Sequence, residues 1–304
     1  MLYVHDLEEP DGIMAFSLES GEWLRTIRIP LGEGPGELKG FGGVALAPGG
    51  SLYLWRYPKA ILVNAMGAVV SDWRPDGASL WMDLCVFGAE PAVPAPHGLI
   101  RRGEEGRDER MAAPRVDRGV LQAGSPEQAV AALRVLSDTR LSCTDDAAFV
   151  APNHPGDPGA ILVYARSGTT GRLEAPPAIL EDPVTGASGR LDLLSDDGRG
   201  NLVLIARDPF GRFPGALMDS ESGCHALLRN PRVQSYRQFA GVHADSALVF
   251  HWDHEEEVRD GKRILHIRDR ANRVTLHPLV RLEGGEECTG ILPSVRSVEI
   301  DRGG

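Results

Sequence analysis

The sequence contains no run of about 18 apolar residues, the length that a membrane-spanning helix needs. Its first residues, MLYVHDLEEPDG, also lack the basic and apolar regions of a signal peptide. These two absences predict a chain that has no membrane partner and stays in the cytoplasm. Secretion would require a precursor longer than the sequence as given.

Cysteine is scarce and widely spaced. The four cysteines form no close Cys-x-x-Cys pair, which excludes a zinc ribbon or a thioredoxin-like motif. Free thiols are therefore the default expectation. Because four is an even number and disulfides accompany secretion, two disulfides stay open as the alternative. The residues concerned are Cys85, Cys143, Cys224 and Cys288.

Motifs of the common catalytic and nucleotide-binding classes are also missing. The sequence has no Gly-x-Ser-x-Gly elbow, no His-Glu-x-x-His pair and no Gly-x-x-x-x-Gly-Lys loop. The glycine-rich GEGPGE, Gly32 to Glu37, contains a proline and leads into a strand, so we interpret it as a turn. A net charge of −11 and a pI near 5.3 would repel a phosphate backbone, which argues against a nucleic-acid partner.

Glycine and proline are abundant instead, and a repeat of about fifty residues accompanies them. The 36 glycines and 22 prolines suit many short strands joined by tight turns. A polar turn followed by an apolar strand recurs at intervals of about 46 to 55 residues. The six copies lie near Gly21, Gly67, Gly119, Gly168, Gly223 and Ala271. Six copies predict an all-β chain in which residues 1–304 form one six-bladed β-propeller of four-stranded antiparallel blades.

The two ends of the sequence predict how the propeller closes. MLYVHD aligns with the second strand of the next blade, SLYLWR, so the first blade would lack its inner strand. SVEIDRGG, from Ser297 to Gly304, matches the inner strand GVALAPGG. We therefore expect the C-terminal strand to pair with the N-terminal blade, which would leave no open sheet edge. One short helix is expected near 125–136, where Ser125, Pro126 and Gln128 form a helix-starting pattern.

The segment from Gly32 to Val70 resembles the NHL-type repeat of six-bladed propellers. The likeness rests on the Gly-x-Gly-Pro-Gly-Glu opening, the Pro-Gly-Gly turn and the hairpin that leads to the outer strands. The resemblance implies a six-bladed fold that is often used to bind proteins, peptides or glycans. Some relatives of this architecture are lactonases or amidating lyases that hold calcium or zinc at the axis.

Arginine recurs at one position of the blade alignment, at the start of the inner strand. Four blades carry it, as Arg140, Arg190, Arg237 and Arg296. If these guanidinium groups converge on the channel entrance, they would bind a carboxylate or a phosphate. The alternative is that each arginine pairs with a carboxylate such as Asp83, Asp192 or Glu299 and joins adjacent blades.

A second cluster, HWDHEEE from His251 to Glu257, follows the second strand of the last blade. Imidazole and carboxylate groups could hold zinc or another divalent ion. Equivalent positions elsewhere carry His5 with Asp6, Asn153 with His154, and Arg207 with Asp208. A charged hairpin tip exposed to solvent is the simpler interpretation.

The sequence thus favours a non-catalytic propeller that binds a protein or an anionic small molecule, with no cofactor. The alternative is a metal-dependent hydrolase or lactonase with calcium or zinc at the propeller axis. A third hypothesis is a purely structural module of a larger assembly.

Overall fold

The computed structural model describes most of the chain. The described residues are 1–5, 12–40, 42–76, 83–95, 98–103, 105–112, 139–152, 159–181, 189–206, 214–229, 237–243, 245–259, 262–282 and 299–301. Within these ranges there is no α-helix, and the only helical elements are two 3-10 turns, η1 (Pro48–Gly50) and η3 (Pro177–Ile179). The short helix predicted near 125–136 lies outside the described residues.

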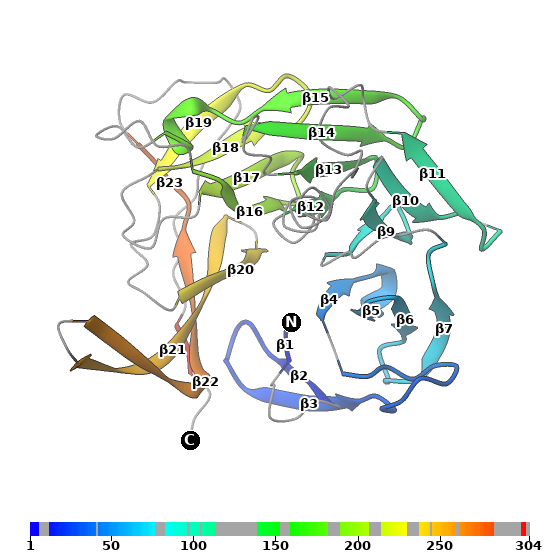
Figure 1. Cartoon of the computed structure of the whole chain (residues 1–304), viewed down its shortest axis with the longest axis horizontal. Coiled ribbons are helices and arrows are strands. Elements are labelled where there is room, and N and C mark those ends of the chain that lie inside the picture. Colours follow the sequence, from blue (N-terminus) through cyan, green and yellow to red (C-terminus); the bar gives the residue numbers. More distant parts are fainter. Residues whose placement is uncertain are drawn as a thin grey trace. The chain divides into compact units, whose positions relative to one another are not determined.

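The described strands form six antiparallel sheets, four of which are built only from strands that follow one another along the chain (Figure 1). Blade 1 consists of β1 (Leu2–His5), β2 (Gly12–Phe16) and β3 (Trp23–Arg28). Blade 2 consists of β4 (Gly43–Leu46), β5 (Leu52–Arg56), β6 (Lys59–Val63) and β7 (Val69–Trp73). Blade 3 consists of β8 (Cys85–Phe87), β9 (Glu90–Ala95), β10 (Gly98–Arg102) and β11 (Asp108–Ala112).

Blades 4 to 6 follow the same plan, except that β23 joins blade 5 and β24 completes blade 6. Blade 4 consists of β12 (Arg140–Cys143), β13 (Ala147–Ala151), β14 (Ala160–Ala165) and β15 (Thr170–Glu174). Blade 5 consists of β16 (Leu191–Asp196), β17 (Asn201–Ala206), β18 (Gly215–Asp219), β19 (His225–Arg229) and β23 (Val280–Arg281). Blade 6 consists of β20 (Arg237–His243), β21 (Ser246–Arg259), β22 (Lys262–Pro278) and β24 (Glu299–Asp301). The predicted six-bladed, all-β propeller is confirmed.

The chain divides into two compact units. One comprises Tyr3–Met14 and Arg25–Ala175, and it contains blades 2, 3 and 4. The other comprises Met1–Leu2, Ala15–Leu24 and Pro176–Gly304, and it contains blades 5 and 6. Blade 1 has residues in both units. Asp83, Arg140 and the disulfide between Cys85 and Cys143 lie in the first of these units, which we call the blade 2–4 unit, whereas Arg190 lies in the other.

The second strands of the blades are buried on both faces. β5 has four consecutive buried residues, β13 has four and β17 has five. Fourth strands such as β15 alternate between exposed and partly exposed residues. This difference arises because the middle of each sheet packs against other apolar side chains on both sides, whereas the outer strand meets water. A continuous apolar run therefore marks a second strand of this fold.

Most of the repeating turns lie where the sequence predicts them. Four of the six predicted copies of the repeat contain a tight turn whose glycine has a φ between 71° and 89°, which glycine adopts without steric cost. These glycines are Gly21, Gly67, Gly168 and Gly223. In blade 3 the equivalent turn runs from Gly103 to Arg107, upstream of the copy predicted near Gly119. The turn predicted near Ala271 is wrong, because Ala271 lies within the long strand β22.

The predicted closure is also wrong. The strand β24 pairs with β22, in the register Val274 to Ile300, and blade 1 has three strands. After Pro278 the chain leaves blade 6, and β23 adds to blade 5 by pairing Leu228 with Arg281. The outer edge of β22 therefore needs a partner, and β24 covers it. The alternating pattern of SVEIDRGG fits any open edge, so the sequence alone could not decide between blade 1 and the edge of β22.

Candidate functional site

The starts of the first strands form the candidate site, because the sequence places its recurring arginine there. In the blade 2–4 unit, β8 contacts β4 and β12. The neighbouring strands β8 and β12 run parallel, since Asp83 bonds to Leu141 and Cys85 to Cys143 with the same separation of 58 residues. The starts of β8 and β12 therefore lie at the same edge of this unit.

The structure places the four arginines as follows. Arg140 is the first residue of β12 and is partly buried. Arg190 immediately precedes β16 and is also partly buried. Arg237 begins β20, where its backbone pairs with His251, and its side chain lies outside the described part. Arg296 lies outside the described residues altogether. Arg140 belongs to the blade 2–4 unit, and Arg190 and Arg237 belong to the other.

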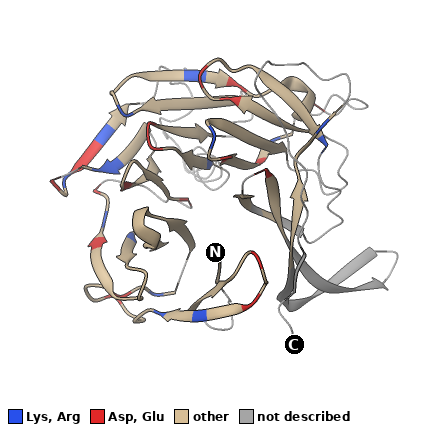
Figure 2. Ribbon diagram, turned by 180° about the vertical axis from the view of Figure 1, so that it is seen from behind, with Lys and Arg blue, Asp and Glu red and all other residues tan. Residues whose placement is uncertain are grey.

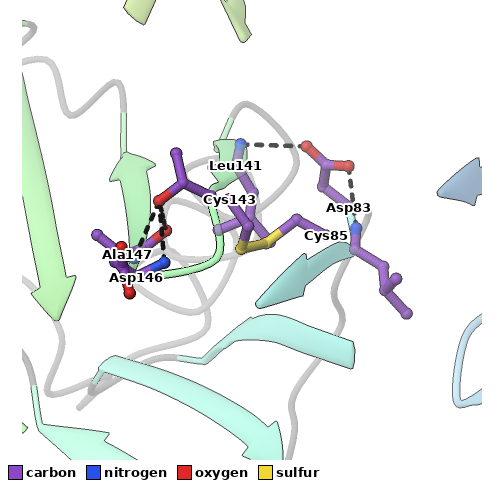
Figure 3. Close-up of a disulfide and its surroundings, with 8 residues drawn as sticks. Asp83, Cys85, Leu141, Cys143, Asp146 and Ala147 are labelled. Atoms are coloured by element: carbon purple, nitrogen blue, oxygen red, sulfur yellow. Dashed lines mark hydrogen bonds between the residues drawn. A yellow bond between two sulfur atoms is a disulfide. The ribbon is translucent and has the colours of Figure 1, made fainter. Parts of the chain in front are cut away.

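Asp83 joins blade 3 to blade 4 through hydrogen bonds to the backbone. Its Oδ1 accepts a bond from the N–H of Leu84 at 2.9 Å, and its Oδ2 accepts one from the N–H of Leu141 at 3.1 Å (Figure 3). The guanidinium of Arg140 donates to the carbonyl oxygen of Thr139 at 3.3 Å. Asp83 thus joins the two blades through a hydrogen bond from a backbone N–H, whereas the sequence hypothesis had paired a carboxylate with an arginine side chain.

Two residues further along both strands, Cys85 and Cys143 form a disulfide, with their Cα atoms 5.6 Å apart (Figure 3). Cys224 is disulfide-bonded as well, and the part of the chain that the structure describes contains no free cysteine. The default expectation of free thiols is therefore wrong for these three residues. The alternative that the sequence left open, disulfide pairing, is what the structure has.

The carboxyl group of Asp83 has a raised pKa. Burial raises the pKa of Asp83 to about 6, whereas the backbone hydrogen bonds from Leu84 and Leu141 and the charge of Arg140 act to lower it. Burial is the largest of these effects because the charged form loses its contact with water. Asp83 therefore changes its charge near neutral pH, which an exposed aspartate does not do.

At the start of β4, in blade 2, the indole of Trp55 lies against Gly42 and Gly43. Trp55 pairs with Gly43 across β4 and β5 and is 5% exposed. The N–H of Gly42 donates to the carbonyl oxygen of Trp55 at 2.5 Å. The indole Nε1 is buried, and no acceptor is found for it among the described residues. A buried N–H without an acceptor is costly, and the packing of the indole in the core outweighs this cost.

The GEGPGE segment is confirmed as a turn. The Glu37 carboxylate accepts from the N–H of Gly34 at 2.8 Å, and the N–H of Glu37 donates to the carbonyl oxygen of Gly34 at 3.1 Å. The buried Lys59 donates to the same carbonyl oxygen at 2.6 Å. Because Glu37 already occupies the N–H of Gly34, this amide does not face outward for a phosphate.

The predicted histidine cluster lies in an extended arm. His251 to Glu257 belong to β21, which pairs with β22 over almost its whole length, for example Glu255 with His266. Their side chains, and that of His5, lie outside the described part, as do Asp6, Asn153, His154, Arg207 and Asp208. Among the described side chains, no group of three His, Cys, Asp or Glu residues could hold a metal ion. Nor do the described helical elements include one long and apolar enough to cross a membrane.

Sequence reasoning named Asp83 only as one candidate partner for an arginine, and it did not pair Cys85 with Cys143. A signal was present, because Asp83-x-Cys85 and Leu141-x-Cys143 have the same spacing on consecutive first strands. This spacing was not recognised because the strands of blade 3 were aligned on a turn predicted near Gly119. The turn lies at Gly103 to Arg107 instead.

Six consecutive antiparallel sheets define the chain as a six-bladed β-propeller. No family model matches the chain, and no curated protein matches it. Solved structures of propeller proteins are similar to it in fold. A catalytically inactive virginiamycin B lyase from Staphylococcus aureus, solved with quinupristin, is 11% identical, with 89% of this chain and 81% of that chain covered and a TM-score of 0.48. BamB from Moraxella catarrhalis is also 11% identical, with 91% and 95% covered and a TM-score of 0.44.

Proposed function

We propose that this chain is a non-catalytic binding propeller, and that the starts of its first strands contact an anionic ligand. The ligand would be a small molecule that carries a carboxylate or a phosphate, or an acidic segment of a protein. The observation that carries the proposal is the position of Arg140, which is the first residue of β12 and is partly buried. Arg190, in the other unit, directly precedes β16 and is partly buried as well, so each arginine is considered as an anion donor of its own blade.

The chemistry of these positions supports recognition of an anion. A guanidinium group donates paired N–H groups that match the oxygens of a carboxylate or a phosphate. Lys and Arg residues are otherwise scattered along the strands among acidic residues (Figure 2), and the net charge is −11. An anion would therefore be held by individual donors and not by a broad basic face.

Replacing Arg140 or Arg190 by glutamine is expected to weaken binding of inorganic sulfate about tenfold each, because each change removes a charge-assisted hydrogen bond. Isothermal titration calorimetry at constant ionic strength measures this effect. Arg107→Gln is the matched control, since its side chain is 85% exposed on the turn between β10 and β11. If both variants bind sulfate as tightly as the unchanged chain and Arg107→Gln, the proposal is wrong.

We further infer that the chain works in an oxidising compartment. Cys85, Cys143 and Cys224 are all disulfide-bonded, and such bonds form and persist where thiols are not kept reduced. This supports the secreted alternative over the cytoplasmic expectation, which rested on the absence of a signal peptide.

The thiol content of the native protein tests this inference. When the protein is taken from its own cells and alkylated before any reduction, we expect Cys85 and Cys143 to stay unmodified. After reduction in denaturant, both should be alkylated. Mass spectrometry of the cysteine peptides measures the difference. Complete alkylation of Cys85 and Cys143 in the first step would contradict the inference.

A further inference from the structure

A carboxylate and a guanidinium lie beside each other at the starts of the first strands of blades 3 and 4. Asp83 precedes β8 by two residues, and Arg140 is the first residue of β12. The Oδ2 of Asp83 accepts from the N–H of Leu141, the residue after Arg140, at 3.1 Å, and the Arg140 guanidinium donates to the carbonyl oxygen of Thr139 at 3.3 Å. Both groups therefore lie along the backbone of residues 139–141, where the charge of Arg140 acts on the Asp83 carboxyl group. The disulfide between Cys85 and Cys143 ties the same two strands, so the two groups are held in one arrangement.

We propose that Asp83 controls the positive charge available at Arg140, so that an anion binds there more tightly when Asp83 is protonated. This inference rests on the proposed function and adds a pH response to it. When Asp83 is ionised, it offsets the charge of Arg140 and repels an incoming carboxylate or phosphate. When Asp83 is neutral, the guanidinium attracts the anion without this opposition.

The position of Asp83 makes this response selective. Burial raises its pKa to about 6, so the group is neutral below that pH and charged above it. Among the described strands, β4, β9, β12 and β13 pack against β8. Neither β4 nor β13 carries a titratable side chain. On β9 the only one is Glu90, which pairs with Phe87 at the far end of β8. On β12 the charged residue is Arg140, because Cys143 is disulfide-bonded and does not titrate.

Sulfate is the probe of choice, because it keeps its charge over the whole range in which Asp83 titrates. At constant ionic strength, the unchanged chain is expected to bind sulfate about tenfold more tightly at about pH 5 than at about pH 8, because water and salt screen most of the repulsion between the two like charges. Asp83→Asn should bind at both pH values with the affinity that the unchanged chain has at about pH 5. Calorimetry measures all four affinities.

A second measurement uses the unchanged chain only, and it decides the matter even if Asp83→Asn does not fold. Because coupling between two sites is reciprocal, bound sulfate must raise the pKa of Asp83 by about one unit. Carbon-13 NMR of the aspartate carboxyl groups, with and without sulfate, reports this change. Sulfate affinity that varies with pH equally in Asp83→Asn, or an Asp83 pKa that sulfate leaves unchanged, overturns the inference.

The failure of this inference can be distinguished from the failure of the proposed function. If Arg140→Gln loses sulfate binding while the pH response stays the same in Asp83→Asn, the anion site stands and the role of Asp83 is wrong. If Arg140→Gln and Arg190→Gln bind sulfate normally at both pH values, the anion site itself is wrong.

Discussion

Replacing Cys85 and Cys143 together by alanine is expected to lower the free energy of unfolding by about 4 kcal/mol. The disulfide joins residues that are 58 positions apart. A cross-link over a loop of this length restricts the unfolded chain, and the loop-closure estimate gives about 4 kcal/mol at room temperature. Urea unfolding without reductant, followed by circular dichroism, measures the loss.

The double variant is preferable to reduction of the unchanged chain, since a reductant would also open the bond of Cys224. Replacing both cysteines by serine is the companion variant. If the loss comes from the cross-link, the alanine and serine pairs should be destabilised to a similar extent, whereas a loss of packing would make the serine pair worse. A loss below about 1 kcal/mol in the alanine pair would contradict a disulfide in the folded state.

Local features of the fold could be predicted from the sequence because their causes are local. Gly21, Gly67, Gly168 and Gly223 lie in turns that need a positive φ, and glycine adopts such a φ readily. These turns recur at intervals of about fifty residues along a chain of 304, which predicts six blades although the copies near Gly119 and Ala271 were misplaced. In the same way, the apolar run LYLW from Leu52 to Trp55 marks a strand that is buried on both faces.

The partner of the C-terminal strand could not be predicted, because a period of two fits every open edge. The segment around Glu299 to Asp301 was expected in blade 1 and pairs with β22. What decides its place is the departure of the chain after Pro278, which frees the edge of β22, and nothing near Glu299 records that departure. The NHL resemblance of Gly32 to Val70 stays a prediction, since it concerns a single blade.

Of the candidate site, the arginines could be predicted from the sequence, but the charge state of Asp83 could not. Arginine at the start of a strand is visible in the sequence, so Arg140 and Arg190 could be named. The charge state of Asp83 depends on its burial and on the N–H of Leu141, 58 residues away. Only a correct register for blade 3 brings these two residues together, and its turn differs from those of the other blades.

Gly43→Ala is expected to lower the free energy of unfolding by about 3 kcal/mol. A Cβ atom on Gly43 would lie 2.8 Å from Cε2 of Trp55 and closer still to Cζ2 and Cη2 of the same ring. The indole is 5% exposed and packs with the buried Tyr53 and Trp73, so it cannot turn away without opening this core. Urea unfolding followed by tryptophan fluorescence measures the change.

Gly171→Ala on β15 is the matched control, because its added Cβ would meet only Val163, at 3.8 Å, and stability should change by less than about 0.5 kcal/mol. A double-mutant cycle then tests the cause. In a chain that carries Trp55→Leu, the clash partner is gone, so Gly43→Ala should cost less than about 1 kcal/mol. If the effects of Gly43→Ala and Trp55→Leu simply add, the loss comes from the strand backbone and the indole does not hold the start of β4 in place.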